Sequence, residues 1–326
     1  MPTNATTTEP LPFPERAACR LCPHECGVNR LAGQAGFCGA GVVPRVFRHG
    51  PHFGEEPPIS GTHGSGTVFF SHCTMRCVYC QNYPWSQLHQ GENLEIPQLT
   101  EIFRTLAEKG CHNWNLVSPT PWLPQIRAAL EPLIRDGIRR PFVYNSSGFE
   151  SPKTLASFRD LADIALVDLR YSTTGTAREA SACPEYVEAA RATLEWCWRE
   201  LGPLQCDDDG IATRGTICRV LVLPGHAQEA VDSLRWLADT LGNTLHVSVM
   251  AQYTPVHQAR TRPEWNRRIT PEEYESVKAA AGELGFDNGW IQDYKDAAEP
   301  ADLLGCNMPA GETSVGKKPG ENGRGG

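Results

Sequence analysis

The sequence contains no run of about 18 apolar residues, so we expect no membrane-spanning helix and no membrane partner. It also lacks an excess of positive charge, because 30 basic residues face 38 acidic ones and the formal net charge is −8. This balance argues against a nucleic-acid partner bound through its phosphates. The first residues lack a basic stretch followed by an apolar core, so we predict no secretory signal and a cytoplasmic location.

Two glycine-rich nucleotide motifs are also missing. The sequence has no G-x-x-x-x-G-K-[ST] loop, and no G-x-G-x-x-G follows a predicted strand. Such loops bring backbone N–H groups close to phosphates. The sequence therefore gives no support for a nucleoside triphosphatase or a nicotinamide-dependent enzyme.

Cysteine, by contrast, is plentiful. The chain has 13 cysteines, and in a reducing compartment these are metal ligands more often than disulfides. Seven of them form two clusters within residues 19–80. The other six share no ligand spacing and are interpreted as small buried hydrophobic residues: Cys111, Cys183, Cys197, Cys206, Cys218 and Cys306.

One cluster has three cysteines, and no fourth cysteine follows closely. Cys73, Cys77 and Cys80 are spaced C-x3-C-x2-C in "SHCTMRCVYCQNY". A closed zinc site uses four ligands, and an ordinary iron–sulfur cluster is held by four thiolates. Three ligands leave one coordination position open, which is typical of a catalytic metal centre.

The other cluster, here called the N-terminal cysteine cluster, has four members: Cys19, Cys22, Cys26 and Cys38. Four cysteines predict a closed site, and His24 is a candidate substitute ligand. Both a structural zinc ion and an auxiliary iron–sulfur cluster are compatible with the spacing, which does not choose between them.

The chain divides into four parts by composition. Residues 1–16 are rich in Thr and Pro and are expected to be disordered. Residues 17–60 are rich in Cys and Gly and predict a small metal-binding module built from loops. Residues 61–300 carry an alternating pattern of apolar runs and helical segments, and residues 301–326 form a C-terminal extension with a flexible tail.

The alternating part predicts an α/β fold. Apolar runs that suit buried strands occur at 67–71, 115–119, 141–147, 164–169, 218–225 and 246–253. Helical patterns between them indicate βαβ units and a parallel sheet, either an incomplete (β/α)6 barrel or, as the alternative, a doubly wound open sheet. Thr270 and Glu273 predict a capping box, Ser151 predicts an N-cap, and Pro132 predicts a kink or break.

The position of the three-cysteine motif allows a family resemblance to be stated. The motif follows the first predicted strand of the barrel, and the aromatic Tyr79 stands just before its last cysteine. In these features the chain resembles the radical S-adenosylmethionine superfamily over about residues 61–295. The segments "GEEPPISGTHGSGTVFFSHCTMRCVYCQNY", "NSSGFES" and "CRLCPHECGVNR" are similar to an uncharacterised branch related to the pyruvate formate-lyase-activating enzyme.

The resemblance implies a chemistry and two cofactors. Cys73, Cys77 and Cys80 are then expected to hold a 4Fe-4S cluster whose unique iron binds S-adenosylmethionine. Reductive cleavage of that cofactor gives a 5′-deoxyadenosyl radical, which abstracts hydrogen from a substrate. The resemblance further implies a low-potential electron donor, flavodoxin or ferredoxin, and activation of a glycyl-radical enzyme as one role of the radical.

Further residues are matched to the family one at a time. Tyr79 is expected against the adenine, and the polar segment Asn145, Ser146 and Ser147 takes the place of a family element near the cofactor. Asn145 stands where those enzymes have Asp, so the sequence does not settle whether a cation binds there. The remaining cofactor-binding candidates are Asp168, Arg170, Gly225 and His226. Arg170 replaces a lysine and offers a bidentate fork for a carboxylate.

Two other functions remain open on the sequence alone. A radical enzyme could modify a peptide or a small molecule instead of a glycyl-radical enzyme. A non-catalytic iron–sulfur scaffold or electron carrier would keep the cluster without turnover. Family likeness does not fix the substrate.

Overall fold

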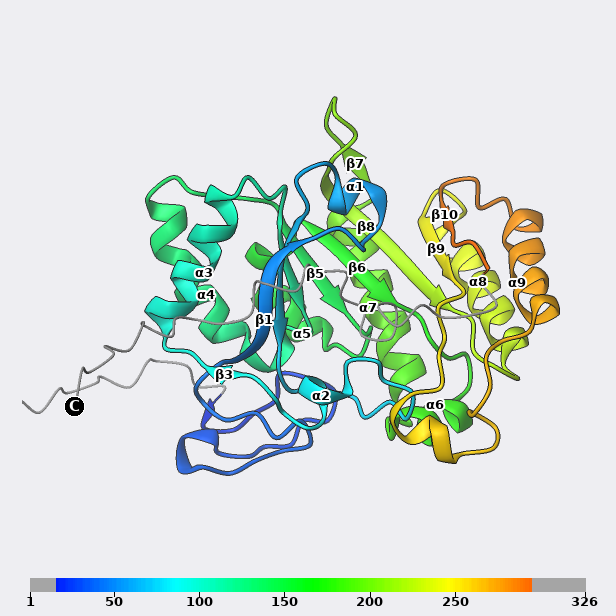
Figure 1. The fold of residues 1–326 in the computed structure, drawn as a ribbon, viewed down its shortest axis with the longest axis horizontal. Coiled ribbons are helices and arrows are strands. Elements are labelled where there is room, and N and C mark those ends of the chain that lie inside the picture. The colour runs from blue at the N-terminus through cyan, green and yellow to red at the C-terminus, as the bar shows by residue number, and fades with distance from the viewer. Residues whose placement is uncertain (1–15, 295–326) are drawn as a thin grey trace, which may run out of the picture.

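The computed structural model describes residues 16–294, which form an α/β fold around one mostly parallel sheet of ten strands (Figure 1). Of the expected disordered start (residues 1–16), residues 1–15 lie outside the described residues, as does the expected C-terminal extension (residues 301–326). Arg16 is described and buried, so the expectation of disorder is wrong for that residue. The strands are β1 (Arg45–His52), β2 (Ser65–Phe70), β3 (Glu92–Asn93), β4 (Trp114–Val117), β5 (Phe142–Ser146), β6 (Ile164–Asp168), β7 (Gln205–Cys206), β8 (Ala212–Leu221), β9 (His246–Met250) and β10 (Gly289–Ile291).

Nine α-helices and four short 3-10 helices occur in the described part of the chain. The α-helices are α1 (Pro57–Ser60), α2 (Tyr83–Ser86), α3 (Ile96–Glu108), α4 (Leu123–Arg135), α5 (Pro152–Ser157), α6 (Thr174–Ser181), α7 (Tyr186–Leu201), α8 (Ala227–Leu241) and α9 (Pro271–Glu283). The 3-10 helices are η2 (Arg30–Ala32), η3 (Thr120–Trp122), η4 (Arg159–Leu161) and η5 (His257–Thr261). Within residues 16–294, none of the helices has both the length and the apolarity to cross a membrane.

The parallel strands are arranged in the order in which they occur along the chain. They run β2, β4, β5, β6, β8, β9 and β10, and β1 and β3 extend the β2 edge in antiparallel pairing. A doubly wound sheet reverses its strand order at a switch point, and this sheet does not. The order is compatible with a partial barrel whose two edges, β10 and β3, are not paired with each other in the described residues.

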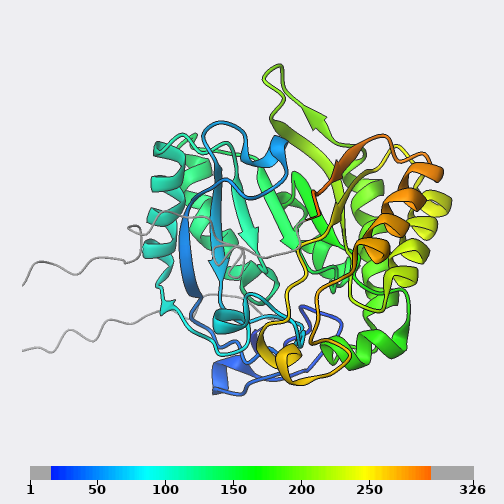
Figure 2. The same cartoon turned by 45° about the vertical axis from the view of Figure 1, so that its right-hand side comes forward.

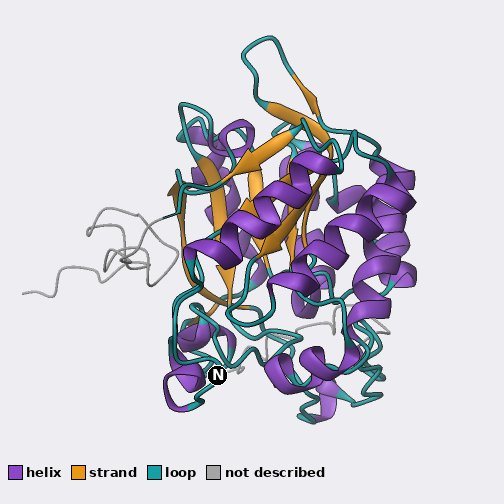
Figure 3. Cartoon of the chain, turned by 90° about the vertical axis from the view of Figure 1, so that its right-hand side faces the viewer, coloured by secondary structure: helices purple, strands orange, loops and turns teal. Residues whose placement is uncertain are grey.

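The two faces of the sheet have different neighbours. Phe142 and Tyr144 of β5 join the main core between the sheet and the long helices, whereas Val143 joins a smaller cluster on the other face with Ile59 of α1. This is the period-2 alternation of a strand. Figures 2 and 3 show the long helices along one side of the curved sheet, with α8 and α9 packed together near β10.

The local helix signals had different outcomes. Thr270 and Glu273 form the predicted capping box of α9, with both reciprocal hydrogen bonds present. Ser151 occupies the N-cap of α5, but its side chain makes no capping hydrogen bond. Of the kink or break predicted at Pro132, the break is wrong, because α4 continues through this residue to Arg135, and the kink stays a prediction. Pro132 lies in the last turn, where few helical residues follow it.

The cysteine-rich segment lies at the carboxyl end of the parallel strands (Figure 1). Cys19 and Cys38 belong to a loop region whose one short helix is η2. Residues 45–52, inside the range expected for the loop-built module, instead form β1 and pair with β2 in the main sheet. The loop region is therefore held against the sheet by the strand that continues from it.

Candidate functional site

The three-cysteine motif lies in the loop between β2 and α2. Cys73, Cys77 and Cys80 line one cavity of about 600 Å³ at the carboxyl ends of the strands. The backbone of Val78 anchors the loop on two sides: its N–H donates to the carbonyl of Ala180 at 2.8 Å, and its carbonyl accepts from the Ala259 N–H at 2.9 Å. Catalytic groups of α/β barrels occupy this end of the strands.

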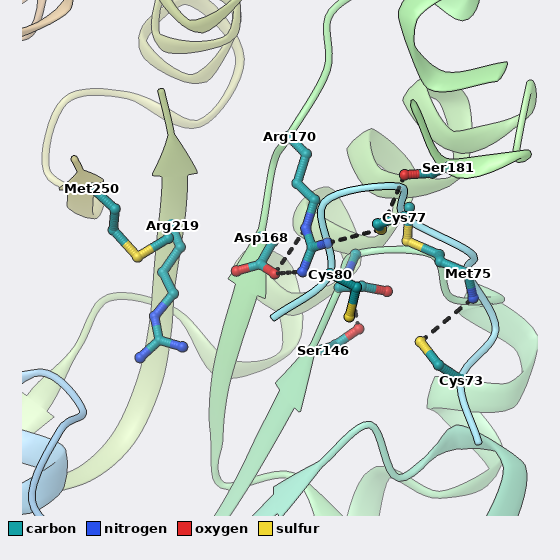
Figure 4. A network of polar contacts seen from close by, with 12 residues as sticks. Cys73, Met75, Cys77, Cys80, Ser146, Asp168, Arg170, Ser181, Arg219 and Met250 are labelled. Atoms are coloured by element: carbon teal, nitrogen blue, oxygen red, sulfur yellow. Dashed lines mark hydrogen bonds and ion pairs between the residues drawn. The ribbon is translucent and has the colours of Figure 1, made fainter. Parts of the chain in front are cut away.

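Hydrogen-bond donors point at the sulfur atoms (Figure 4). The Sγ atom of Cys77 accepts from Arg170 Nη1 at 3.1 Å and from Ser181 Oγ at 3.0 Å. The Met75 N–H donates to Cys73 Sγ at 3.4 Å. Donors of this kind stabilise negative charge on sulfur.

Burial works against ionisation of the same thiols. Desolvation raises the pKa of Cys73 to about 12, with a smaller contribution from Cys77, and it raises the pKa of Cys80 to about 11. Without a cation these two thiols stay protonated at neutral pH. A bound metal deprotonates its cysteine ligands outright, so the burial and the donors together suit a metal–thiolate centre.

Asp168 and Arg170 lie on one rim of the cavity, at the end of β6. Arg170 Nε donates to Asp168 Oδ2 at 3.1 Å and Nη2 donates to the same oxygen at 2.5 Å, while Nη1 is directed to Cys77. Burial would lower the pKa of Arg170, but the charge of Asp168 outweighs it and raises that pKa. Arg170 thus places a fixed positive charge beside the sulfur of Cys77.

Tyr79 is linked to the cysteines by a chain of hydroxyl groups. Its hydroxyl lies 2.6 Å from that of Tyr171, which lies 2.5 Å from Ser181 Oγ, and Ser181 donates to Cys77. The ring of Tyr79 stacks on Trp265, with centroids 5.7 Å apart. Tyr79 lines the cavity and is buried, so its orientation is fixed by both contacts.

The carboxyl end of β5 contributes Asn145 and Ser146 to the cavity wall, and Ser147 follows directly after the strand. Sequence reasoning missed the group that orders this segment, the buried carboxyl of Glu150. Ser146 Oγ donates to Glu150 Oε1 at 2.6 Å, and Thr120 Oγ1 donates to both carboxyl oxygens at 2.7 and 2.8 Å. Desolvation raises the pKa of Glu150 to about 7, although these hydrogen bonds oppose the rise.

Gly225 and His226 lie apart from the other candidates and do not line this cavity. The Gly225 N–H donates to Glu273 Oε1 at 2.7 Å, and the φ angle of Gly225 is 78°, a conformation that favours glycine. The ring of His226 stacks on Trp265 at 5.0 Å between centroids. Because Trp265 also stacks on Tyr79, the indole ring of Trp265 connects His226 to this lining residue of the cavity.

The N-terminal cysteine cluster contains a buried arginine. Arg30 Nη2 donates to Cys19 Sγ at 3.0 Å and lies 3.9 Å from Cys38 Sγ, while Nη1 donates to the carbonyl of Pro121 at 2.7 Å. The residue is 5% exposed and forms no ion pair with a carboxylate in residues 16–294. Burial raises the pKa of Cys38, and the charge of Arg30 opposes that rise.

His24 does not point to the N-terminal cysteine cluster. Its Nε2 atom lies 2.8 Å from the carbonyl oxygen of Thr74, inside the three-cysteine loop, and its ring stacks on Phe37. Nε2 is also 3.9 Å from the sulfur of Cys183, a buried cysteine that the spacing did not single out. His24 therefore joins the cysteine-rich loops to the loop of the three-cysteine motif.

Within residues 16–294, no group of three or more His, Cys, Asp or Glu side chains is arranged to hold a metal ion. The iron–sulfur cluster expected on the three-cysteine motif would contain several irons and would need a space between its thiolates. The cavity that Cys73, Cys77 and Cys80 share is the space in which such a cluster would have to fit.

Comparisons with known proteins leave the family open. No protein-family model matches the sequence. An uncharacterized protein of Methanocaldococcus jannaschii is 28% identical over 280 residues, which are 82% of this chain and 75% of that protein. A crystal structure of a probable 2-pyrone-4,6-dicarboxylic acid hydrolase from Acinetobacter baumannii matches 70% of this chain and 84% of its own, with 13% identity. Its TM-score of 0.29 is too low to carry an argument.

Proposed function

We propose that the protein is a radical S-adenosylmethionine enzyme that uses a 4Fe-4S cluster on Cys73, Cys77 and Cys80. The observation that carries the proposal is the shared cavity of about 600 Å³, which the three sulfurs line together with Tyr79 and Arg170. Ligand sites of proteins have about this volume. The resemblance of the motif to the superfamily supports the same interpretation.

The residues present fit the cofactors by their chemistry. The three cysteines line one cavity, and hydrogen-bond donors reach the sulfurs of Cys73 and Cys77. When bound, the cluster supplies an electron that splits S-adenosylmethionine into methionine and a 5′-deoxyadenosyl radical able to abstract hydrogen. Arg170 and Asp168 present opposite charges at the rim, where an amino acid's carboxylate and amine each have a partner.

The partners and the substrate belong to the proposal as well. A low-potential donor such as flavodoxin or ferredoxin would deliver the electron. The resemblance to the pyruvate formate-lyase-activating enzyme implies activation of a glycyl-radical enzyme as the role of the radical. Modification of a peptide or small molecule is the alternative within the same chemistry.

The decisive experiment is formation of 5′-deoxyadenosine by anaerobically reconstituted protein with dithionite and S-adenosylmethionine. The wild type should form it, and Cys77→Ala should abolish it because the cluster loses one of three ligands. Cys206→Ala is the matched control, since Cys206 lies on the exposed hairpin strand β7 and should keep wild-type turnover. Full turnover in Cys77→Ala would refute the assignment. A wild type with a cluster but without product would be the scaffold or electron carrier.

A further inference from the structure

The cavity that the three cysteines line also contains a group of charged side chains. We call this group the acidic floor: Glu55, Glu56 and Arg219. All three residues line the same cavity. The two glutamates come from the turn between β1 and α1, and Arg219 comes from β8, paired in register with Asp168 of β6. The floor is therefore reached from the cysteine loop without leaving the cavity.

The floor is a tight ion-pair network. Arg219 Nε and Nη2 donate to the two carboxyl oxygens of Glu56 at 2.7 and 2.5 Å, and Nη2 also donates to Glu55 Oε2 at 2.5 Å. Glu55 Oε1 accepts from Asn115 Nδ2 at 2.8 Å and from Asn145 Nδ2 at 3.4 Å. Burial would raise the pKa of Glu56, but Arg219 outweighs it and the pKa is lowered, so Glu56 is ionised at neutral pH.

The charges of the floor do not balance. Two carboxylates face one guanidinium, which leaves a surplus of one negative charge. The remaining charged groups along the cavity, Asp168 with Arg170 and Asp293 with Arg268, cancel in number. A surplus charge in a region shielded from water is costly unless a ligand of opposite sign neutralises it.

Two buried polar atoms next to the floor lack a hydrogen-bond partner among the described residues. His52 lines the cavity, is 4% exposed, and has no partner at Nδ1. Asn115 is fully buried, and its Oδ1 has no partner although its Nδ2 donates to Glu55. Burial lowers the pKa of His52, so its neutral ring has a nitrogen that can accept. Among the described residues, unpartnered hydrogen-bond acceptors therefore lie beside a surplus negative charge. A cation that carries N–H groups would satisfy both.

We propose that the acidic floor is the substrate subsite and that it binds a substrate through a positively charged amino or guanidino group. As a statement about substrate class, this rests on the proposed function, with the reacting end of the substrate directed toward the cysteines. The binding preference itself is independent of turnover and can be measured without it.

The test uses two probes that differ in one group, N-acetyl-L-lysine amide and N-acetyl-L-norleucine amide, in calorimetric titrations of the full-length protein without reductant. Charge-assisted hydrogen bonds contribute about 1.5–3 kcal/mol, so the lysine probe should bind the wild type about 10- to 100-fold more tightly. Glu55→Gln should reduce this ratio at least about tenfold, because it removes the surplus charge.

Two features make the variant informative. The side-chain amide introduced by Glu55→Gln can keep its contacts, because a rotated Asn115 carboxamide offers it the unpartnered Oδ1 as an acceptor. Glu101→Gln is the matched control on α3, where the side chain of Glu101 is 66% exposed, and it should keep the wild-type ratio. Equal binding of both probes by the wild type, or no binding of the lysine probe at millimolar concentration, overturns the proposal. So does an unchanged ratio in folded Glu55→Gln. A lysine preference in a protein that forms no 5′-deoxyadenosine would leave this subsite standing and refute only the radical chemistry.

Discussion

Replacing Glu150 by Gln should change how the stability of the protein depends on pH. The Glu150 carboxyl is 2% exposed, and its pKa rises from 4.5 to about 7 because burial penalises the charged form. The folded state therefore holds a proton between those two pH values that the unfolded state has released. Below pH 4.5 the Glu150 carboxyl is protonated in both states, so its raised pKa does not change the free energy of unfolding. As the pH rises toward 7, this carboxyl lowers the free energy of unfolding by an increasing amount.

The magnitude follows from the size of that pKa rise. At 1.36 kcal/mol per pH unit, the wild type should lose about 2.5 kcal/mol of unfolding free energy between pH 5 and pH 8 through this carboxyl alone. Glu150→Gln has no such proton and should lack the loss. Urea unfolding of both proteins, prepared with the same metal content, should show the variant gaining about 2.5 kcal/mol relative to the wild type over this range.

Other titrating groups are common to both proteins and cancel in the difference. Glu101→Gln, on the exposed face of α3, should follow the wild-type profile. Parallel profiles for Glu150→Gln and the wild type would refute the reasoning. They would mean that the hydrogen bonds from Ser146, Thr120 and Tyr144 fully compensate burial of the charge.

Two further predictions concern the metal centres. Arg170→Ala should weaken S-adenosylmethionine binding by about 1.5–3 kcal/mol in equilibrium dialysis, because it removes the charge beside Cys77, and unchanged affinity would show that Arg170 does not contact the cofactor. Changing all four members of the N-terminal cysteine cluster to Ser should remove one metal centre, lower stability, and preserve the spectral change on cofactor binding. Metal analysis of the wild type should give one zinc per chain or about eight irons, and about four irons without zinc would contradict both forms of the site.

The sequence predicted the features that depend on residues close in the chain. The capping box of α9 involves Thr270 and Glu273, only three residues apart, and each of the six apolar runs overlaps one parallel strand. The agreement is poorest for β8, which begins at Ala212, well before its apolar run at 218–225. The register of β1 depends on pairing with β2, so its membership of the sheet could not be predicted from its own composition. β10 has only three residues, too few for a periodic signal.

The site was predicted unevenly for a similar reason. Cys73, Cys77 and Cys80 have a recognisable spacing. Glu55 and Arg219 form an ion pair although they are 164 positions apart in the sequence, so no local pattern connects them. One signal was available, because Arg219 is a charged residue inside the apolar run "CRVLVLPG". A charge in a buried strand requires a partner, and the pair "EE" before α1 is the partner that the fold supplies.

In both cysteine clusters an arginine side chain donates to a cysteine sulfur, and this feature bears on whether a metal is bound there. Arg170 lies beside Cys77, and Arg30 lies beside Cys19. Arg170 also pairs with Asp168, but within residues 16–294 the acceptors of Arg30 are one carbonyl and two sulfurs, and the residue is 5% exposed. A buried guanidinium with neutral thiols as its neighbours would carry an uncompensated charge, which is costly. Thiolates bound to a metal would supply the missing negative charge. The position of Arg30 therefore favours a metal–thiolate centre at the N-terminal cysteine cluster over four unligated thiols.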